Sequence, residues 1–256
     1  VLGLEPPAEP PEEIEAVDEG TILHRTLREF YSERRRRRGD ARINEDEVDD
    51  AAKRICEIAD RHLDSFRRRN PGLNRGLFRL QRESMHDVLV KFVHAEFENQ
   101  KSDAFRMVPR YFEVAFGLPV NAAADDPRST DTQLVIDMEG EPSVRIIGKI
   151  DRIDVSDLPT GEKRAFGFRV IDYKRKWVPT RKQDIAEGTA LQMPVYLAAA
   201  RDVIFAGEGI QPIDAQFYKL IGAKVTTAIR RLKSVKSGIE PDDRGDELIE
   251  EAIDFI

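Results

Sequence analysis

The chain has 256 residues, of which 35% are charged, and its net charge is −7. No apolar run approaches the ~20 residues that cross a bilayer, so the sequence predicts a soluble protein without a membrane partner. This length allows one well-filled hydrophobic core or two small ones.

The chain is expected to be a piece of a longer polypeptide, because it begins with Val1 and carries no secretory signal. Its single cysteine, Cys56, excludes an internal disulfide and a cysteine-rich metal site within this fragment. A lone cysteine on an apolar helix face is a small core residue, and it fits a reducing cytoplasm.

The first part of the chain is predicted to be helical. Residues 1–17 are rich in proline and glutamate and form an extended lead-in. Apolar residues then recur at helical spacing from about Gly20, with Asp18 as a possible cap, and again over 44–69 and 76–100. On this pattern alone His24, at the edge of the first apolar stripe, is a packed helix residue rather than a ligand. The other histidines, which show no metal-ligand spacing, are expected to face solvent or be hydrogen-bonded: His62, His86 and His94.

The pattern then changes to the two-residue period of strands, over 110–116 and 132–138. Glu113 on the first of these strands is either a further acidic site residue or an edge residue that faces water. Two longer strands follow, 145–155 and 164–174, joined by a turn over 156–163 that contains proline and glycine.

Charged residues within this hairpin indicate a catalytic site. Asp151 lies in an apolar run, and Asp172 and Lys174 end another, where an unpaired charge is costly. Residues two apart share a face of a strand, so Asp172 and Lys174 point the same way and Tyr173 points the other. A closed hairpin brings Asp151 onto the strand next to Asp172. Two carboxylates at one site favour a divalent cation, and a neighbouring lysine can meet a phosphate, which is the chemistry of metal-assisted phosphodiester hydrolysis.

A basic loop follows, and then a helix is predicted over 189–205. Gln192 and Tyr196 share one face of this helix. Gln192 also completes a possible capping box with Thr189, and Tyr196 can be a core residue with its hydroxyl at the surface. A last strand is predicted over 215–221, and a helix begins near Glu247.

Helices followed by strands with one crossover helix predict an α/β fold with a mixed central sheet flanked by helices. We expect a single domain over 18–256. Its helical part covers 18–103, its sheet core 104–222 and its C-terminal segment 223–256.

The negative net charge argues against a nucleic-acid partner, but the distribution of charge matters more. The arginines at 34–38 fit a solvent-exposed surface as well as they fit a contact with nucleic acid. The cluster of Arg175, Lys176, Arg181 and Lys182 adjoins the Asp172–Lys174 pair, where a phosphate backbone would lie. A third basic cluster spans 219–236.

With these residues identified, the chain resembles the PD-(D/E)XK nuclease superfamily, and within it the RecB/AddB-like branch. The matching segments lie in the expected order on the expected elements between Gly20 and Tyr218: 20–24 (GTILH), 148–154 (GKIDRID), 171–174 (IDYK) and 192–196 (QMPVY). The resemblance implies a restriction-endonuclease-like core.

The resemblance also implies the site. His24, Asp151, Asp172 and the backbone carbonyl of Tyr173 would ligate Mg²⁺ or Mn²⁺, so the helix-based reading of His24 is set aside. Lys174 would be the catalytic lysine, together with Asp172 and Asp151. Gln192 and Tyr196 would line the site and meet DNA. Asp154 faces away from Asp151 on the same strand, and we expect it to be a structural or salt-bridging residue.

Two departures from the family pattern stand out. Arg175-Lys176-Trp177 follows the lysine where the family often has a small residue and glycine. The cysteines that hold an iron–sulfur cluster in many relatives are absent, so no such cluster is possible within this fragment.

The expected function is a divalent-metal-dependent DNA nuclease, an exonuclease of DNA repair and recombination that works with a helicase domain or subunit. The alternative is a DNA-binding or assembly module that keeps the fold without cleaving.

Overall fold

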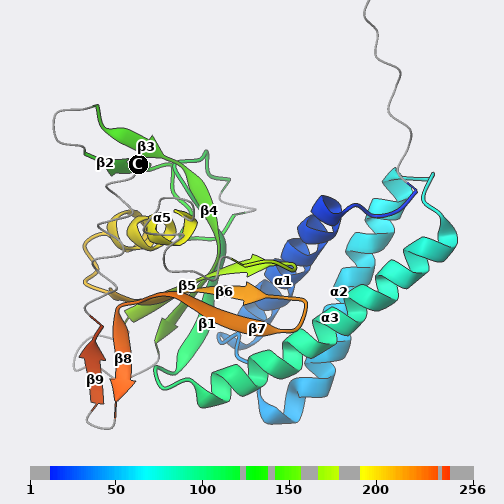
Figure 1. The fold of residues 1–256 in the computed structure, drawn as a ribbon, viewed down its shortest axis with the longest axis horizontal. Helices are drawn as coiled ribbons and strands as arrows, with labels where there is room; N and C mark the ends of the chain where they lie inside the picture. Colours follow the sequence, from blue (N-terminus) through cyan, green and yellow to red (C-terminus); the bar gives the residue numbers. More distant parts are fainter. Residues whose placement is uncertain are drawn as a thin grey trace, which may run out of the picture.

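A mixed five-stranded sheet forms the centre of the protein (Figure 1). The computed structural model describes residues 12–121, 125–137, 142–156, 167–178, 191–235 and 238–242. The strands of the sheet, in spatial order, are β1 (Met107–Phe116), β4 (Gly148–Ser156), β5 (Gly167–Lys174), β6 (Gln211–Lys219) and β7 (Lys224–Arg230). β5 and β6 run parallel, and the other neighbours run antiparallel. The predicted mixed sheet is confirmed.

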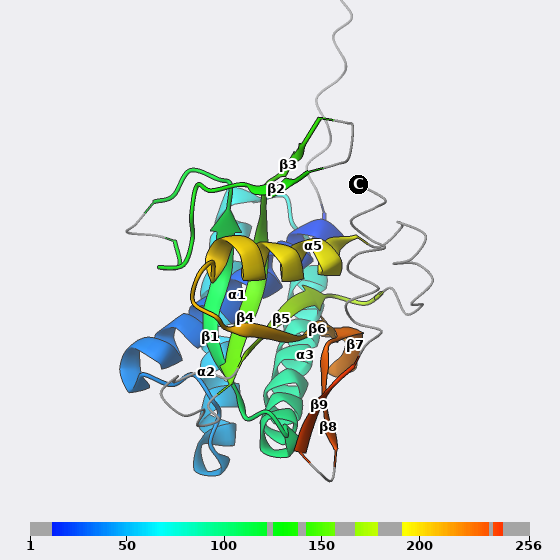
Figure 2. The same ribbon diagram turned by 90° about the vertical axis from the view of Figure 1, so that its left-hand side faces the viewer.

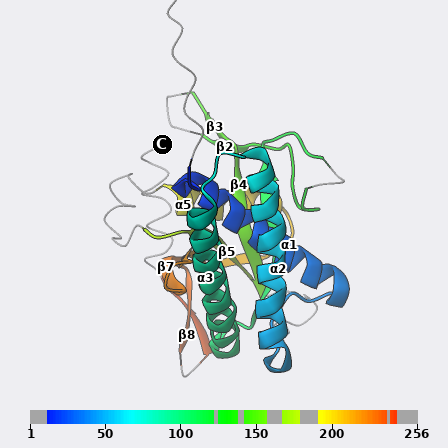
Figure 3. The same ribbon diagram turned by 90° about the vertical axis from the view of Figure 1, so that its right-hand side faces the viewer.

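Three helices cover one face of the sheet (Figure 3): α1 (Ala16–Arg38), α2 (Val48–Arg69) and α3 (Arg75–Ser102). A short 3₁₀ turn, Glu45–Glu47, leads into α2. Asn74 caps α3 by accepting hydrogen bonds from the N–H groups of Gly76 and Leu77. The predicted cap of α1 is wrong, because the helix begins before Asp18, after Glu15, which makes no side-chain cap.

The opposite face of the sheet carries α5 (Gln192–Ala199), which continues as a π-helical turn over Ala200–Ile204 (Figure 2). Parallel strands need a crossover connection, and α5 lies in the connection between β5 and β6. The crossover helix was predicted over 189–205, and residues 189 and 190 lie outside the described part of the chain.

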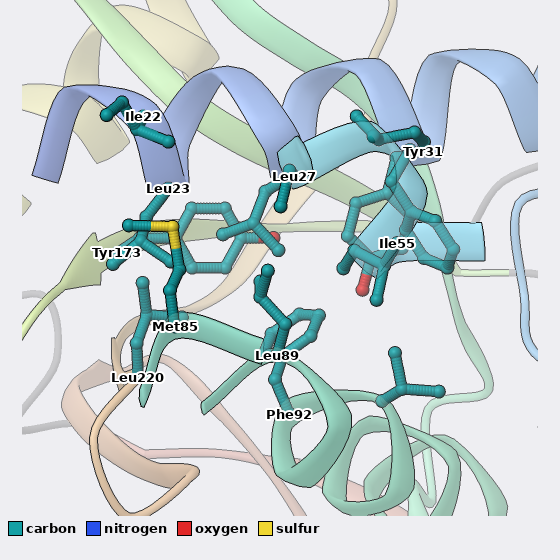
Figure 4. Packing of buried hydrophobic residues seen from close by; sticks show 14 of the residues in the cluster. Ile22, Leu23, Leu27, Tyr31, Ile55, Met85, Leu89, Phe92, Tyr173 and Leu220 are labelled. Carbon is teal, nitrogen blue, oxygen red and sulfur yellow. The ribbon is translucent and has the colours of Figure 1, made fainter. Parts of the chain in front are cut away.

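Separate hydrophobic cores fill the two sides of the sheet. The first core lies between α1–α3 and the sheet and includes Leu27, Phe92 and the ring of Tyr173 (Figure 4). The second lies between the sheet and α5 and includes Phe217 and Leu197. The Tyr173 ring points into the first core, so Asp172 and Lys174 share the other face of β5, as predicted. The structure shows that this is the face that carries α5.

The long strand predicted over 145–155 is broken at Ile147. Its first part, β3 (Val144–Ile146), pairs with β2 (Leu134–Ile136) in a separate two-stranded ribbon. The strand predicted over 132–138 therefore lies in this ribbon and not in the central sheet. Gly148 starts β4 where a Cβ atom would lie 2.9 Å from the Phe116 ring, so this close approach needs glycine. Most of the turn predicted over 156–163 lies outside the described residues.

The strand predicted over 215–221 is not the last one. β7 follows it, and β8 (Leu232–Val235) and β9 (Gly238–Pro241) form a further antiparallel ribbon. β7 mixes its apolar residues with lysine, threonine and arginine, and β8 and β9 have four residues each. None of the three shows the sustained apolar alternation that identifies a strand. The lead-in up to residue 11 and the helix predicted from Glu247 lie outside the described residues. Among the helices that the structure describes, none combines the length and apolar character of a membrane span.

Two glycine substitutions are expected to change stability in opposite directions. A Cβ atom on Gly167 would lie 2.5 Å from the backbone oxygen of Gln211, which cannot move without disturbing the β5–β6 pairing. Gly167→Ala should therefore lower the free energy of unfolding by about 1–3 kcal/mol. Gly20 lies within α1 with no atom near its Cβ position, so Gly20→Ala should raise it by about 0.5–1 kcal/mol. Urea denaturation measures both, and equal effects would contradict this packing argument.

Candidate active site

The site forms where β4 and β5 stop pairing. Their backbone register ends at the pair Arg152 and Ile171. Beyond this point side chains replace the missing strand partner of Tyr173. Its N–H donates to Asp151 Oδ2 at 2.8 Å, and its carbonyl oxygen lies 3.1 Å from Nε2 of His24 on α1. Since an unpaired buried peptide group is costly, these two contacts hold both side chains against the opened edge of the sheet.

A histidine and two carboxylates meet at this opening. His24 Nδ1 lies 3.2 Å from Asp151 Oδ1 and 3.8 Å from Glu113 Oε1. Candidate ligand atoms of the three residues lie within 4.8 Å of one another. Burial lowers the pKa of His24, but hydrogen bonds to Asp151 and Glu113 outweigh burial and raise the pKa to about 10.

Glu113 reaches this cluster from β1. The β1–β4 register places it opposite Asp151, between the pairs of Phe112 with Arg152 and of Val114 with Ile150. Its φ angle is +55°, in the left-handed region that non-glycine residues seldom adopt. Such strain persists where surrounding contacts hold it, typically at functional sites. Of the two interpretations open for Glu113, the acidic site residue is the one that the geometry favours.

A second group of polar side chains lies on the α5 side. Lys174 Nζ lies 2.7 Å from Asp172 Oδ2 and donates to Gln192 Oε1 at 2.8 Å. The Gln192 amide nitrogen donates to Asp172 Oδ1 at 2.8 Å and to the Tyr196 hydroxyl at 3.0 Å. The Gln192 amide and the Tyr196 hydroxyl are therefore both engaged in the site, while Thr189, the partner in the possible capping box, lies outside the described residues.

The Asp172 carboxylate is 4% exposed. Burial, and next the charge of Asp151, raise its pKa to about 6, while Lys174 lowers it. Two carboxylates that repel each other in this way are stabilised by a cation between them. Lys174 supplies part of that positive charge from the α5 side.

The structure thus brings together the predicted residues His24, Asp151, Asp172, Lys174 and Gln192, with Tyr173 and Tyr196 beside them. Asp172 lies next to the cluster of His24, Glu113 and Asp151 rather than within it. Sequence reasoning did not assign Glu113 to the site. Its signal was a charge in an apolar strand, but its place opposite Asp151 depends on the strand register.

The predicted DNA-binding residues differ in their surroundings. Arg175 forms an ion pair with Glu19 on α1, whereas Lys176 is exposed. Arg181 and Lys182 lie outside the described residues. The arginines at 34–38 are engaged with Glu33, Glu47, Asp126 and backbone oxygens, so a solvated, internally paired face explains them.

Other predicted roles away from the site are confirmed. Asp154 forms a bidentate pair with Arg152 at 2.5 and 2.6 Å on the other face of β4. His86 Nε2 lies 2.7 Å from Asp60 Oδ1, and His62 Nε2 lies 2.9 Å from Glu29 Oε2. These histidines are partnered within the helical layer.

The residues at the strand opening fit a divalent cation. They offer carboxylate oxygens, a backbone carbonyl and one imidazole nitrogen, and hard cations such as Mg²⁺ and Mn²⁺ prefer oxygen-rich ligand sets.

The mixed sheet, with two acids and a lysine where its strands diverge, has the architecture of the nuclease class. Comparison with known proteins agrees: the chain belongs to the PD-(D/E)XK nuclease superfamily, whose model matches residues 1–255. The chain is also 32% identical over 134 residues to an ATP-dependent helicase/deoxyribonuclease subunit of Caldanaerobacter subterraneus subsp. tengcongensis. That alignment covers 52% of this chain but only 10% of the relative. The chain thus corresponds to a small part of that protein.

Proposed function

We propose that this chain is a divalent-metal-dependent deoxyribonuclease domain, an exonuclease that works with a helicase domain or subunit in DNA repair and recombination. The observation that carries the proposal is the convergence of His24, Glu113 and Asp151 beside the Asp172–Lys174 pair. DNA as substrate and a helicase as partner are carried over from the name of the helicase/deoxyribonuclease relative.

Each residue has a distinct role in this proposal. His24, Glu113, Asp151 and the Tyr173 carbonyl would hold Mg²⁺ or Mn²⁺, with Asp172 facing the ion. The ion supplies positive charge that offsets the charge of the scissile phosphate. Lys174 meets the phosphate oxygens, because Asp172 and Gln192 hold its ammonium group in one position. Tyr196 keeps the Gln192 amide in place, and the basic residues after Lys174 follow the DNA backbone.

The direct test is cleavage of single-stranded, duplex and forked DNA with Mg²⁺, with Mn²⁺ and with a chelator. We expect degradation from DNA ends that needs the metal. A protein that binds DNA but leaves all three substrates intact in either metal would be a non-cleaving module, and the proposal would then be wrong.

Substitutions in the proposed ligand set should weaken metal binding. His24→Ala removes the imidazole ligand and Glu113→Gln removes a negative charge, and both leave the Asp172–Lys174 pair in place. We expect the Mn²⁺ affinity, measured by calorimetry, to fall by at least roughly 10-fold for each, the lower bound for disturbing a metal site. Asp60→Asn, which changes an acid partnered by a histidine in the helical layer, is the matched control and should leave the affinity unchanged.

Gln192→Leu should reduce cleavage without abolishing it. The change removes the hydrogen bonds that orient Lys174 and Asp172 and preserves approximate side-chain size. Because such supporting partners typically contribute 10–100-fold, we expect kcat to fall by about that factor. KM for DNA should change little. An equal loss for Gln81→Leu, on α3, would show that the effect is not specific to the site.

A further inference from the structure

A row of lysines extends from the proposed site across three neighbouring strands. Lys174 on β5 pairs in register with Lys219 on β6, and Lys219 pairs with Lys224 on β7. These strands lie side by side in Figure 1. Neighbouring strands are about 4.8 Å apart, and residues directly opposite each other point to the same face. The three lysine side chains therefore leave the sheet on the face that carries Asp172.

This arrangement is unfavourable for the isolated protein, because like charges directly opposite each other repel. Asp172 relieves the repulsion only at Lys174. Lys219 is half-buried and Lys224 is exposed, and neither forms an ion pair with any residue that the structure describes. An anionic partner along this end of the sheet would offset the repulsion.

The second feature is Trp177, the only tryptophan of the chain, which is 72% exposed. The residues around it are anchored. Arg175 pairs with Glu19 on α1, and its carbonyl oxygen accepts a hydrogen bond from the N–H of Ile221, just beyond β6. On the other side Val178 is buried in the second core. The indole is therefore presented to solvent from an anchored backbone, and the Cα atoms of Trp177 and Lys174 lie within about 11 Å, the reach of three residues.

An exposed aromatic ring beside a row of lysines suits single-stranded nucleic acid. Unpaired bases stack on aromatic side chains, and lysines contact the phosphates. In a duplex both faces of an internal base are already stacked, so the indole has no free base to cover.

We propose that Trp177 stacks on an unpaired base of a DNA strand whose phosphates lie along Lys219 and Lys224, so that a single-stranded segment is positioned at the site. The inference rests on the proposed function, because it takes DNA as the ligand. It adds positioning residues and a preference for unpaired substrate.

The single tryptophan allows a direct test in the full 256-residue chain. An Asp172→Asn background in chelator prevents degradation of the probe, an oligothymidylate. Stacking should quench the tryptophan emission as the oligonucleotide is added, and a duplex of equal length should quench it much less. By fluorescence anisotropy of a labelled oligothymidylate, Trp177→Ala should weaken binding roughly 5- to 150-fold. Trp177→Phe, which keeps an aromatic face, should retain most of the affinity.

The contribution of the lysines is tested separately, by the salt dependence of binding. Lys219→Ala and Lys224→Ala should each reduce the slope of log K against log salt by about 0.7, the value for one phosphate contact on a single strand. The matched controls are Lys53→Ala on α2 and Leu80→Ala on α3, both exposed and away from this end of the sheet, and they should change neither affinity nor slope.

Saturable binding without quenching, or an unchanged affinity in Trp177→Ala, would overturn the inference, and Trp177 would then be assigned to a protein contact. These outcomes are distinct from failure of the proposed function. If the unsubstituted chain cuts DNA in Mn²⁺ but Trp177→Ala binds normally, only this inference fails. If quenching occurs but no metal supports cleavage, the single-strand site stands and the nuclease assignment fails.

Discussion

Lys174→Met is expected to abolish DNA cleavage while leaving the protein folded. Methionine keeps an unbranched side chain of similar length, but it removes the ammonium group that Asp172 and Gln192 hold in place. Removing one preorganised charge stabiliser from an active site typically costs 10²–10³ in kcat, and we expect a loss of about this size or larger. A single-turnover assay on end-labelled DNA in Mn²⁺ measures it.

The matched control for Lys174→Met is Lys149→Met. Lys149 lies on β4 near the same opening, with its amine 3.6 Å from Glu113 Oε2, but its side chain is 41% exposed and makes no contact with Asp172. Its loss should reduce cleavage far less. If Lys174→Met cuts at the parental rate, then Lys174 is not the catalytic lysine and the assignment of the site is wrong.

The second large effect is expected on stability. Arg152→Met should lower the free energy of unfolding by about 3–5 kcal/mol, because the arginine is the centre of a fully buried polar network. Its guanidinium pairs with Asp154 and lies 2.7 Å from Glu96 on α3. It also donates to the Tyr31 hydroxyl at 2.9 Å. Loss of the arginine leaves Asp154 and Glu96 buried without the ion-pair partner that they share.

Thermal or urea unfolding measures this effect, which corresponds to about 6–20 °C in Tm for a domain of this size. Arg152→Lys keeps a charge but loses the bidentate fork, so it should fall between the parent and Arg152→Met. Arg61→Met on α2 breaks an ion pair whose side chains are 47% and 37% exposed, and it should cost no more than about 1 kcal/mol. Equal losses for Arg152→Met and Arg61→Met would contradict the role of the buried network.

This network also connects stability to the site. Arg152 joins β4 to Tyr31 on α1, and its NH1 group lies 3.4 Å from the Tyr173 hydroxyl. The same helix carries His24, and the same tyrosine supplies the backbone carbonyl proposed as a ligand. The network thus fixes the position of α1 relative to the opened edge of the sheet. It acts at the ring end of Tyr173, whereas His24 contacts the carbonyl oxygen of the same residue.

Local residue patterns were sufficient for the long helices and for the strands at the centre of the sheet. The helical repeats over 44–69 and 76–100 agree with α2 and α3, since buried apolar stripes follow the helix period directly. The two-residue period placed Asp172 and Lys174 on one face of β5, because that relation depends only on the backbone of a single strand. The short motifs around His24, Asp151 and Gln192 predicted the remaining site residues by resemblance to a known family.

What only the tertiary structure decided involves contacts between distant segments. Glu113 belongs to the site because the β1–β4 register places it opposite Asp151, and register is a property of two strands together. The break at Ile147 arises because β3 pairs with β2 while Gly148 packs on Phe116. The late strands β7 to β9 are held by pairing with neighbours, since their own residues carry little apolar pattern. The sequence by itself therefore determined which side chains share a face of a helix or strand, because that depends on one backbone alone. The packing of β1, β4, β5 and α1 determined which of them meet.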